Sequence, residues 1–352
     1  MIPATMQAWR THAYGLRPTE VLQLDTVPVP EPDTGELLVQ VQAIPLNLND
    51  LERINGGNMM VQPELPYSPG MEVMGSVVAT GAGAEARVGE RVVAITKGAN
   101  GGFGEYVNCP AASAYSMPED VPLPEAAALY FPYHLAWLGL IDRANLLPGE
   151  RVLIHAAAGG SGTAAIQIAK HNGATVFATA GTDEKVKLCL ELGADVAINY
   201  NDRDFAAAVR EATGGRGVDV VFDNVGESVM EASLAVTAYN GRYLMMGFAS
   251  NKAVADEKFI VPRRIALGNI KLCGVLLAYS DQETEALLKE MMGWNFPSRA
   301  LGAEIADKVL ELYRCGVVKP VIGQEVGFDE LPEAMEAMAN RQTVGRTVVR
   351  LP

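Results

Sequence analysis

The segment VLIHAAAGGSGTAAIQIAK, residues 152–170, joins an apolar run to a helical pattern through a glycine-rich turn. Within it Gly160, Gly162 and Ala165 fit the pattern G-x-G-x-x-A. In such a turn the first glycine allows a tight bend, the second lets backbone approach a pyrophosphate, and the small third residue lets helix pack on strand. The helix N-terminus adds free N–H groups and a positive dipole end. We expect the loop formed by Gly160, Ser161, Gly162 and Thr163 to hold the pyrophosphate, with a plain turn as the alternative.

The context of this loop favours the phosphate interpretation. From residue 151 onward, apolar strand-like runs alternate with helical patterns. We expect strands at 151–156, 175–180, 195–200, 218–224, 241–247 and 269–277, and helices at 162–173, 183–193, 204–215 and 227–240. Alternation at this interval predicts βαβ units and a parallel, doubly wound sheet. No G-K-[ST] follows the glycines, so the loop is not of the ATP-binding type.

The flanking regions have a different character. Residues up to about 125 are rich in short β-branched runs, at 36–44, 75–80 and 89–95, and indicate a partly open barrel of antiparallel strands. The proline-rich stretch 27–35 is typical of a loop or an edge segment. Helices are expected around 303–315 and 331–340, and a final strand at 345–351. A chain of 352 residues is long enough for two domains.

Composition excludes several classes of function. Apolar residues make up 49% and charged residues 20%, the balance of a soluble globular protein. The net charge of -14 disfavours binding to nucleic acid or to an anionic membrane surface. No apolar run is long enough to span a bilayer, and no secretory leader is visible, so the expected location is cytoplasmic. The cysteines form no C-x-x-C pair, which disfavours a structural zinc site and a disulfide framework.

The end of the second expected strand indicates which dinucleotide binds. NAD-dependent enzymes place an acidic residue there for the ribose hydroxyls. Here Ala180 or Gly181 occupies that position, and Asp183 lies beyond it at the start of the next helix. Small residues and the nearby Lys185 leave room and positive charge for a 2′-phosphate, which favours NADPH. The alternative is that Lys185 is an ordinary solvated helix residue.

The whole chain resembles the medium-chain dehydrogenase/reductase superfamily, and most of all its zinc-independent, quinone oxidoreductase-like branch. The resemblance is carried by HAAAGGSGTAAIQIAK, TAGTDEK, LGADVAINY, TGGRGVDVVFDNVG and GRTVVRL. It implies an α/β fold with a GroES-like β-barrel catalytic domain plus a doubly wound Rossmann domain. The implied boundaries are 1–128 for the first part of the catalytic domain, 129–278 for the NADP-binding domain, and 279–352 for the C-terminal part of the catalytic domain. It also implies a homodimer joined through the edge strand at 269–277.

The resemblance places the zinc motif of related alcohol dehydrogenases at SPGMEVMG, where Met71 stands in the position of the ligating histidine and Glu72 is retained. The segment IPLNLNDLE has no cysteine ligand, and GANGGFGEYV replaces the four-cysteine lobe. A thioether is a poor zinc ligand. We therefore expect no catalytic zinc, with Met71 packed in the core and Glu72 acting as a structural hydrogen-bonding residue.

The resemblance also assigns residues to the cofactor. Around the 2′-phosphate it places Gly181, Thr182, Lys185 and Tyr200. Along the adenosine and nicotinamide ribose it places Val225, Gly247 and Phe248. Near the nicotinamide it places Leu276 and Leu277. Tyr200 could instead be a half-buried strand-end aromatic, and the two leucines could be ordinary core.

Without a metal, hydride transfer from NADPH needs orientation and a dry pocket, and quinones or α,β-unsaturated carbonyls can accept hydride at carbon. Asn47 is the candidate catalytic residue, orienting a substrate carbonyl or the nicotinamide ribose; a turn-stabilising role is the alternative. Leu135 stands where many members have threonine, and His134 before it faces either the nicotinamide or the core. The alternatives to an NADPH-dependent reductase of quinones or enones are an enoyl-thioester reductase and a non-enzymatic NADPH-binding protein.

Overall fold

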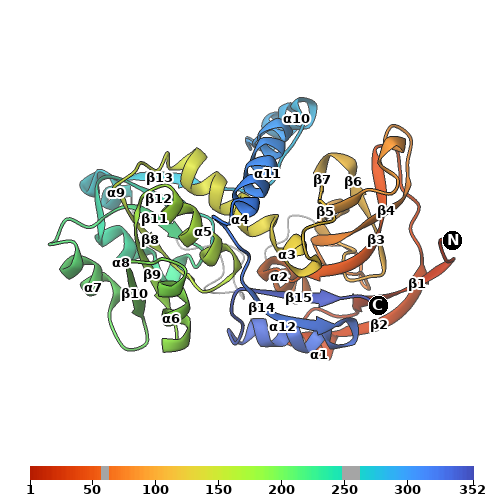
Figure 1. Ribbon diagram of the computed structural model, residues 1–352, viewed down its shortest axis with the longest axis horizontal. Coiled ribbons are helices and arrows are strands. Elements are labelled where there is room, and N and C mark those ends of the chain that lie inside the picture. The colour runs from red at the N-terminus through yellow and green to blue at the C-terminus, as the bar shows by residue number, and fades with distance from the viewer. Residues whose placement is uncertain (57–62, 248–261) are drawn as a thin grey trace. The chain divides into compact units, whose positions relative to one another are not determined.

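The computed structural model describes residues 1–56, 63–247 and 262–352, and the chain divides into two compact units (Figure 1). The first comprises Met1–Tyr130 and Ile322–Pro352, and the second is Phe131–Val321. The second unit thus includes residues 279–321, which the sequence analysis assigned to the catalytic domain. Near the end of this segment, the side chain of Gln167 in the second unit hydrogen-bonds both the N–H and the C=O of Lys319, at 2.7 and 3.1 Å. These contacts explain why the segment groups with the second unit there.

The first unit is built around a seven-stranded sheet. Its strand order is β14-β15-β3-β4-β5-β7, and β6 pairs with the other part of β3. The strands are β3 (Glu36–Pro45), β4 (Glu72–Thr80), β5 (Arg91–Ile95), β6 (Tyr106–Pro110), β7 (Ala114–Ser116), β14 (Ile322–Gly327) and β15 (Arg346–Arg350). All pairs are antiparallel, as expected, except β14 with β15, which is parallel. A separate antiparallel pair consists of β1 (Thr5–Thr11) and β2 (Leu22–Pro28).

Short helices close this unit over an apolar core. They are α1 (Pro18–Val21), α2 (Leu48–Asn55), α3 (Leu123–Ala128) and α12 (Leu331–Ala339), with single turns η1 (Glu85–Arg87), η2 (Lys97–Ala99), η3 (Ala111–Ser113) and η5 (Phe328–Glu330). The alternating residues Leu37, Val39 and Val41 of β3 are buried, as the period of two predicts for one face of a strand. They form one cluster with Ile54 of α2 and Met335 of α12.

The second unit is a six-stranded parallel sheet in the order β10-β9-β8-β11-β12-β13. The strands are β8 (Arg151–Ile154), β9 (Thr175–Ala180), β10 (Val196–Asn199), β11 (Val218–Asp223), β12 (Thr237–Met245) and β13 (Lys271–Gly274). Numbered within this unit, the order is 3-2-1-4-5-6, which is the order of dinucleotide-binding Rossmann sheets. The expected doubly wound fold is therefore confirmed.

The helices of this unit lie before, between and after these strands in the chain. They are α4 (Phe131–Trp137) with its continuation η4 (Leu138–Arg143), α5 (Gly160–His171), α6 (Asp183–Glu191), α7 (Phe205–Ala212), α8 (Glu227–Ala235), α9 (Pro262–Gly268), α10 (Gln282–Met292) and α11 (Arg299–Arg314). The helices expected at 162–173, 183–193 and 204–215 are present. The helix expected at 227–240 ends at Ala235 instead, because Thr237 begins β12 and pairs with Val218 of β11. The sequence analysis did not predict α9, α10 or β14.

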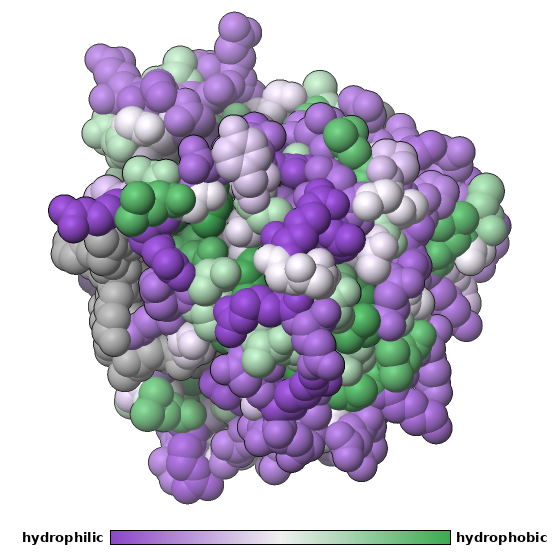
Figure 2. Space-filling view, turned by 90° about the vertical axis from the view of Figure 1, so that its left-hand side faces the viewer, coloured by the Kyte–Doolittle hydropathy of each residue, from purple (hydrophilic) through white to green (hydrophobic). Residues whose placement is uncertain are grey.

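The surface of the second unit is mixed in polarity. Figure 2 views the molecule from the side on which this unit lies in Figure 1, and hydrophobic groups there are separated by polar side chains. Within the described ranges, no helix combines the length and the apolar character needed to cross a membrane.

Candidate functional site

The loop after β8 lies at the point where the sheet order reverses, since β8 lies between β9 and β11. Dinucleotides bind at the carboxyl ends of the strands at such a point. Gly159 is the N-cap of α5 and has no side chain to cap the helix. The first N–H groups of a helix have no partner within it, so this start can receive an anion. The hydroxyl of Thr163 donates within the loop, to the carbonyl of Gly160 at 2.8 Å.

Gly162 has a structural reason within the protein as well, and the approach of its backbone to a pyrophosphate stays a prediction. A Cβ at this position would lie 2.5 Å from Cα of Ala157 and even closer to the carbonyl oxygen of Ala156. The glycine is therefore required by contact between the helix and its own loop, because real Cβ atoms do not approach backbone this closely. The loop is held in one shape by this contact and by the N–H of Ala157, which donates to the carbonyl of Thr179 at 3.1 Å.

The end of β9 brings together four residues that the resemblance assigned to the 2′-phosphate: Gly181, Thr182, Lys185 and Tyr200. A Cβ on Gly181 would lie 2.6 Å from the hydroxyl of Tyr200, so the phenol occupies the space that a side chain would take. Thr182 is the N-cap of α6 and accepts from the N–H of Lys185 at 3.3 Å. Burial lowers the pKa of Lys185. A partly desolvated ammonium of this kind is stabilised by a nearby anion.

Two neighbours complete this edge. The side-chain amide of Asn201 donates to the carbonyl of Gly181 at 2.7 Å, a contact that sequence reasoning missed. The carboxylate of Asp183 accepts from Asn199 at 2.9 Å and is thereby turned toward the end of β10. The acid next to this strand end therefore already has a protein partner.

The turns after β11 and β12 are fixed against each other. The buried carboxylate of Asp223 accepts from the N–H groups of Val225 and Gly226, at 2.7 and 3.0 Å, and from the hydroxyl of Tyr243. Burial raises the pKa of Asp223. A Cβ on Gly247 would overlap the backbone between residues 224 and 225, so this glycine is required by close approach of the two turns. Val225 and Gly247 are thus adjacent, as expected, whereas Phe248 lies outside the described residues.

Asn224 is a further residue at this edge that the sequence analysis did not single out. Its side-chain nitrogen is buried and has no hydrogen-bond partner among the residues that the structure describes. An unsatisfied buried donor is costly, by roughly 1–3 kcal/mol. Together with the glycine contacts at 162 and 247, this donor fits a site completed by a polar ligand.

Leu276 and Leu277 follow β13 at the same edge of the sheet. The N–H of Val275 still donates to the carbonyl of Met245, at 3.1 Å, and the chain then leaves the sheet. Leu276 is 55% exposed, so the alternative that it is ordinary core is wrong. Leu277 is half-buried.

Two buried histidines lie in the second unit. The hydroxyl of Ser233 donates to the carbonyl of Val229 at 2.7 Å, so His155 must donate to Ser233 through Nε2, at 2.8 Å. Its Nδ1 then accepts from the hydroxyl of Thr179 at 2.9 Å, which joins the ends of β8 and β9 to α8. The second histidine, His134 of α4, lies with Nδ1 3.1 Å from the hydroxyl of Tyr279.

The first unit contains a buried polar network at the position of the absent zinc motif. Arg346 donates from Nη2 to the carboxylate of Glu72 at 2.8 Å and from Nη1 to Oδ1 of Asn47 at 2.9 Å. Nδ2 of Asn47 donates to Glu72 and to the carbonyl of Pro45, both at 3.0 Å. Glu72 is fully buried and is structural, as expected. Asn47 has protein partners for both ends of its amide, which gives it a structural task; its contact with substrate stays a prediction.

Asp50 supports the same region. Its two carboxylate oxygens accept from the N–H groups of Asn47 and Met71, at 2.9 and 3.0 Å. Burial raises the pKa of Asp50 to about 6. Met71 is 7% exposed and packs in the core, as expected.

These residues do not fit a zinc ion. The carboxylate of Glu72 is already paired with a guanidinium, and a thioether and an amide stand where imidazole and thiolate ligands are needed. Over the described parts of the chain, no group of three or more His, Cys, Asp or Glu side chains could hold a metal ion.

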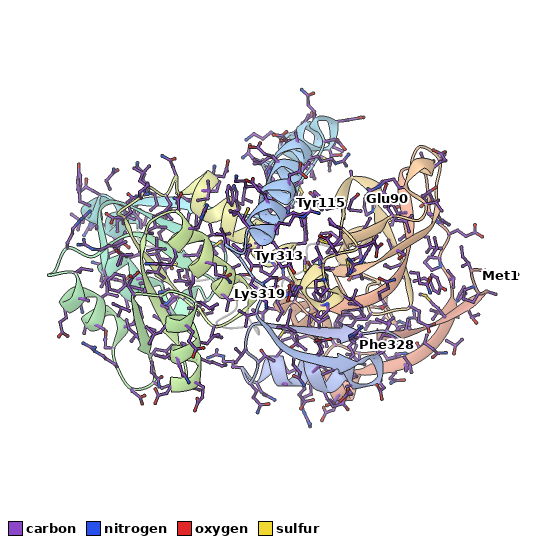
Figure 3. The ribbon with its side chains drawn as sticks, viewed as in Figure 1. Met1, Glu90, Tyr115, Tyr313, Lys319 and Phe328 are labelled. Atoms are coloured by element: carbon purple, nitrogen blue, oxygen red, sulfur yellow. The ribbon has the colours of Figure 1, made fainter. Side chains whose placement is uncertain are left out.

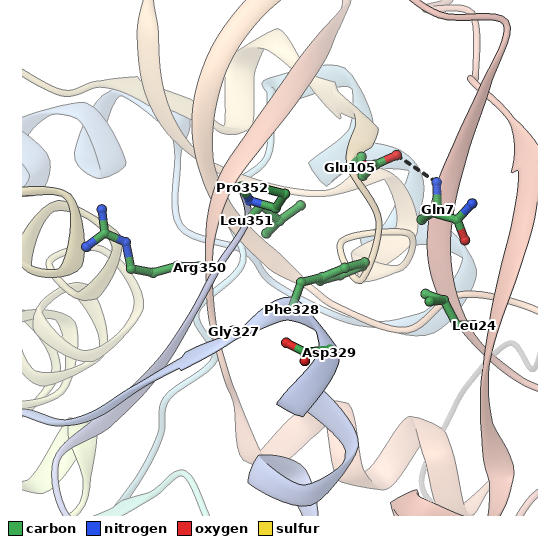
Figure 4. Close-up of a pocket in the computed structure, with 9 residues that line it drawn as sticks. All are labelled: Gln7, Leu24, Glu105, Gly327, Phe328, Asp329, Arg350, Leu351 and Pro352. Carbon is green, nitrogen blue, oxygen red and sulfur yellow. Dashed lines mark hydrogen bonds between the residues drawn. The ribbon is translucent and has the colours of Figure 1, made fainter.

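A surface pocket of about 550 Å³ lies elsewhere in the first unit. Phe328, labelled in Figure 3, is one of the residues that line it, and its carbonyl accepts from the indole N–H of Trp9 at 2.7 Å. Its lining, shown in Figure 4, consists of Gln7, Leu24, Glu105, Gly327, Phe328, Asp329, Arg350, Leu351 and Pro352. None of the expected site residues lines it.

Comparison with known proteins agrees with this geometry. Residues 33–119 match the family model of the alcohol dehydrogenase GroES-like domain, and residues 160–292 match that of the zinc-binding dehydrogenases. The quinone oxidoreductase of Sus scrofa is 33% identical, with 98% of each chain covered. A mycobacterial protein solved in complex with NADPH is 31% identical, with a TM-score of 0.83 and with 98% of this chain and 99% of that chain covered.

A further similar structure is the CurF ER cyclopropanase from the curacin A biosynthetic pathway. It is 27% identical, with a TM-score of 0.80, and the match covers 99% of this chain and all of that chain. The fold, the strand order and these relatives agree with the resemblance seen in the sequence. The chain therefore belongs to the medium-chain dehydrogenase/reductase superfamily, in its quinone oxidoreductase-like branch, and is an oxidoreductase that works with a nicotinamide cofactor.

Proposed function

We propose that this protein is an NADPH-dependent reductase that transfers hydride to a quinone or another α,β-unsaturated carbonyl. The observation that carries the choice of cofactor is the end of β9, where Gly181 has no side chain, the hydroxyl of Tyr200 lies beside it, and Lys185 is in the first turn of α6. In NAD-dependent enzymes an acidic residue occupies this strand end. Here the nearest acid, Asp183, is held by Asn199. The NADPH complex of the mycobacterial relative supports the same choice.

Each part of the carboxyl edge of the sheet has a task in this proposal. The start of α5, from Gly160 to Thr163, receives the pyrophosphate. Thr182, Lys185 and Tyr200 receive the 2′-phosphate. The turns at Val225 and Gly247, with the side-chain amide of Asn224, border the nicotinamide ribose, and Leu277 borders the nicotinamide. When bound, the cofactor supplies the hydride, and the chain supplies orientation and exclusion of water.

Lysine substitution tests the cofactor choice. Lys185→Ala removes one charge beside the proposed phosphate, and a charge-assisted hydrogen bond contributes about 1.5–3 kcal/mol, so the Kd for NADPH should rise about tenfold to a hundredfold. The Kd for NADH should barely change. Lys187→Ala is the matched control, since Lys187 is 78% exposed and pairs with Glu191. Equal weakening of both cofactors by Lys185→Ala, or a wild type that prefers NADH, would show that the cofactor assignment is wrong.

Metal independence is part of the proposal. It is supported by the pairing of Glu72 with Arg346 and by Met71 in place of a histidine ligand. Purified protein should contain no stoichiometric zinc, and incubation with a chelator should leave turnover unchanged. Loss of activity on chelation, restored by zinc, would contradict it.

The substrate class is tested by NADPH oxidation against a panel of quinones, enals and enoyl thioesters, with NADH as the control cofactor. We expect quinones and enals to be reduced. A preference for enoyl thioesters would favour the second candidate, an enoyl-thioester reductase, for which the similarity to the CurF ER cyclopropanase is the supporting observation. The third interpretation, a non-enzymatic NADPH-binding protein, requires that no acceptor in the panel is reduced.

A further inference from the structure

Tyr279 and His134 are two titratable side chains in contact, and the proposed function assigns no task to either. The hydroxyl of Tyr279 lies 3.1 Å from Nδ1 of His134. Their rings meet edge to face, with centroids 5.9 Å apart. His134 is 2% exposed, whereas Tyr279 is half-buried, so the tyrosine is the more accessible residue of the two.

The pair lies on elements at the carboxyl edge of the Rossmann sheet. Tyr279 follows β13 and comes two residues after Leu277. His134 belongs to α4, which continues into η4, and this helix packs on the ends of β11 and β12. A Cβ on Gly139 would lie 3.2 Å from the ring of Phe222 and 3.4 Å from the sulfur of Met246. This is the end of the sheet to which the nicotinamide half of the cofactor is assigned.

His134 is neutral in this environment, because burial lowers its pKa to about 3. A neutral imidazole carries one N–H and one bare nitrogen, so it can present either of them to the phenol. With the proton on Nδ1, the imidazole donates to the phenolic oxygen, and the O–H of Tyr279 is then directed toward a different acceptor.

We propose that Tyr279 is the proton donor of the reduction and that His134 is its positioning residue. This inference rests on the proposed function and adds to it the acid that completes hydride transfer. Hydride, which the bound nicotinamide cofactor would supply, forms a C–H bond at the β-carbon of the conjugated carbonyl, and the π electrons move to the carbonyl oxygen. The O–H bond of Tyr279 then breaks, and its proton forms an O–H bond on that oxygen. The tyrosinate accepts a hydrogen bond from Nδ1–H of His134 and regains a proton from water.

Tyr279→Phe tests the donor directly, since it keeps the ring against His134 and removes only the hydroxyl. Positioned general acids contribute about 10²- to 10⁴-fold, so kcat with an enal should fall by that factor. The Kd for NADPH should be unchanged, and the solvent isotope effect on kcat should change. Tyr239→Phe is the matched control, because Tyr239 is 82% exposed and should keep wild-type kcat.

Two substitutions of the histidine test its positioning role. His134→Asn keeps a hydrogen-bonding group near the position of Nδ1 and should retain more kcat than His134→Leu, with similar NADPH affinity in both. If wild type is active and Tyr279→Phe retains wild-type kcat on every acceptor, this inference is wrong while the proposed function stands. If wild type reduces no acceptor although it binds NADPH, the proposed function fails, and the donor role fails with it.

Discussion

Replacing Asn47 by alanine separates the two roles considered for this residue. As a substrate-orienting group, Asn47 would contribute to kcat and little to stability. As a member of the buried network it would contribute mainly to stability, because its amide lies between Glu72 and Arg346. The contacts described here predict the second outcome.

The expected loss of stability follows from the bonds that are removed. The side chain of Asn47 makes three hydrogen bonds, two of them to charged groups, and the residue is only 2% exposed. Hydrogen bonds to charged groups contribute about 1.5–3 kcal/mol each, and Glu72 and Arg346 remain paired with each other in the variant. We therefore expect the free energy of unfolding to fall by about 3–6 kcal/mol, the sum of two such bonds.

Urea unfolding of wild type, Asn47→Ala and Asn49→Ala measures this loss. Asn49 is the matched control, because it is the same residue type in the same helix, is half-buried, and lies where alanine has the higher helix propensity. Turnover is measured in parallel, well below the melting temperature of the weaker variant. An Asn47→Ala protein with wild-type unfolding free energy and greatly reduced kcat would refute the structural assignment and support the catalytic one.

Three further outcomes are expected. Gly162→Ala should weaken NADPH and NADH binding equally and lower the melting temperature, since overpacking costs about 1–3 kcal/mol. Gly159→Ala should change little, because its Cβ would meet only the carbonyl oxygen of Ala156, at 3.3 Å. Identical cofactor titrations and melting curves for the two variants would contradict this. Burial raises the pKa of Asp50 from its usual 3.8 to about 6, so the contribution of the protonated carboxyl to stability is present below pH 4 and is lost as pH rises through 6. The unfolding free energy of wild type relative to Asp50→Asn should therefore fall by about 3 kcal/mol between pH 4 and 7. A difference that does not depend on pH would argue against a buried titrating carboxyl. Light scattering should show a homodimer joined at β13, an edge strand on which Leu272 is 37% exposed. Leu272→Asp should shift the equilibrium from dimer toward monomer. A monomeric wild type would contradict the assembly.

Local pattern was sufficient for the second unit of the fold. The alternation of strands and helices after residue 151 and the glycines of the phosphate loop are visible in short windows, because each βα unit depends on its own periodicity and turn residues. The residue types that disfavour a zinc site, at Met71 and in the segment before Asp50, were also readable, since they need no knowledge of the fold. The start of β12 was not readable, because Thr237 is a strand residue only through its pairing with Val218.

The tertiary structure alone decided what the polar residues do. Asn47 and Arg346 are 299 residues apart in sequence and meet because β15 pairs antiparallel with β3, with Val348 opposite Pro45. His134 and Tyr279 are 145 residues apart, and their contact depends on where α4 and the segment after β13 lie in the second unit. Even at Gly162 the pattern identified the residue but not the direction of close approach, which is toward the loop backbone at Ala157. Residue type and spacing specify local conformation, whereas hydrogen-bond partners over long sequence separations follow from strand order and register, which no short window of the sequence contains.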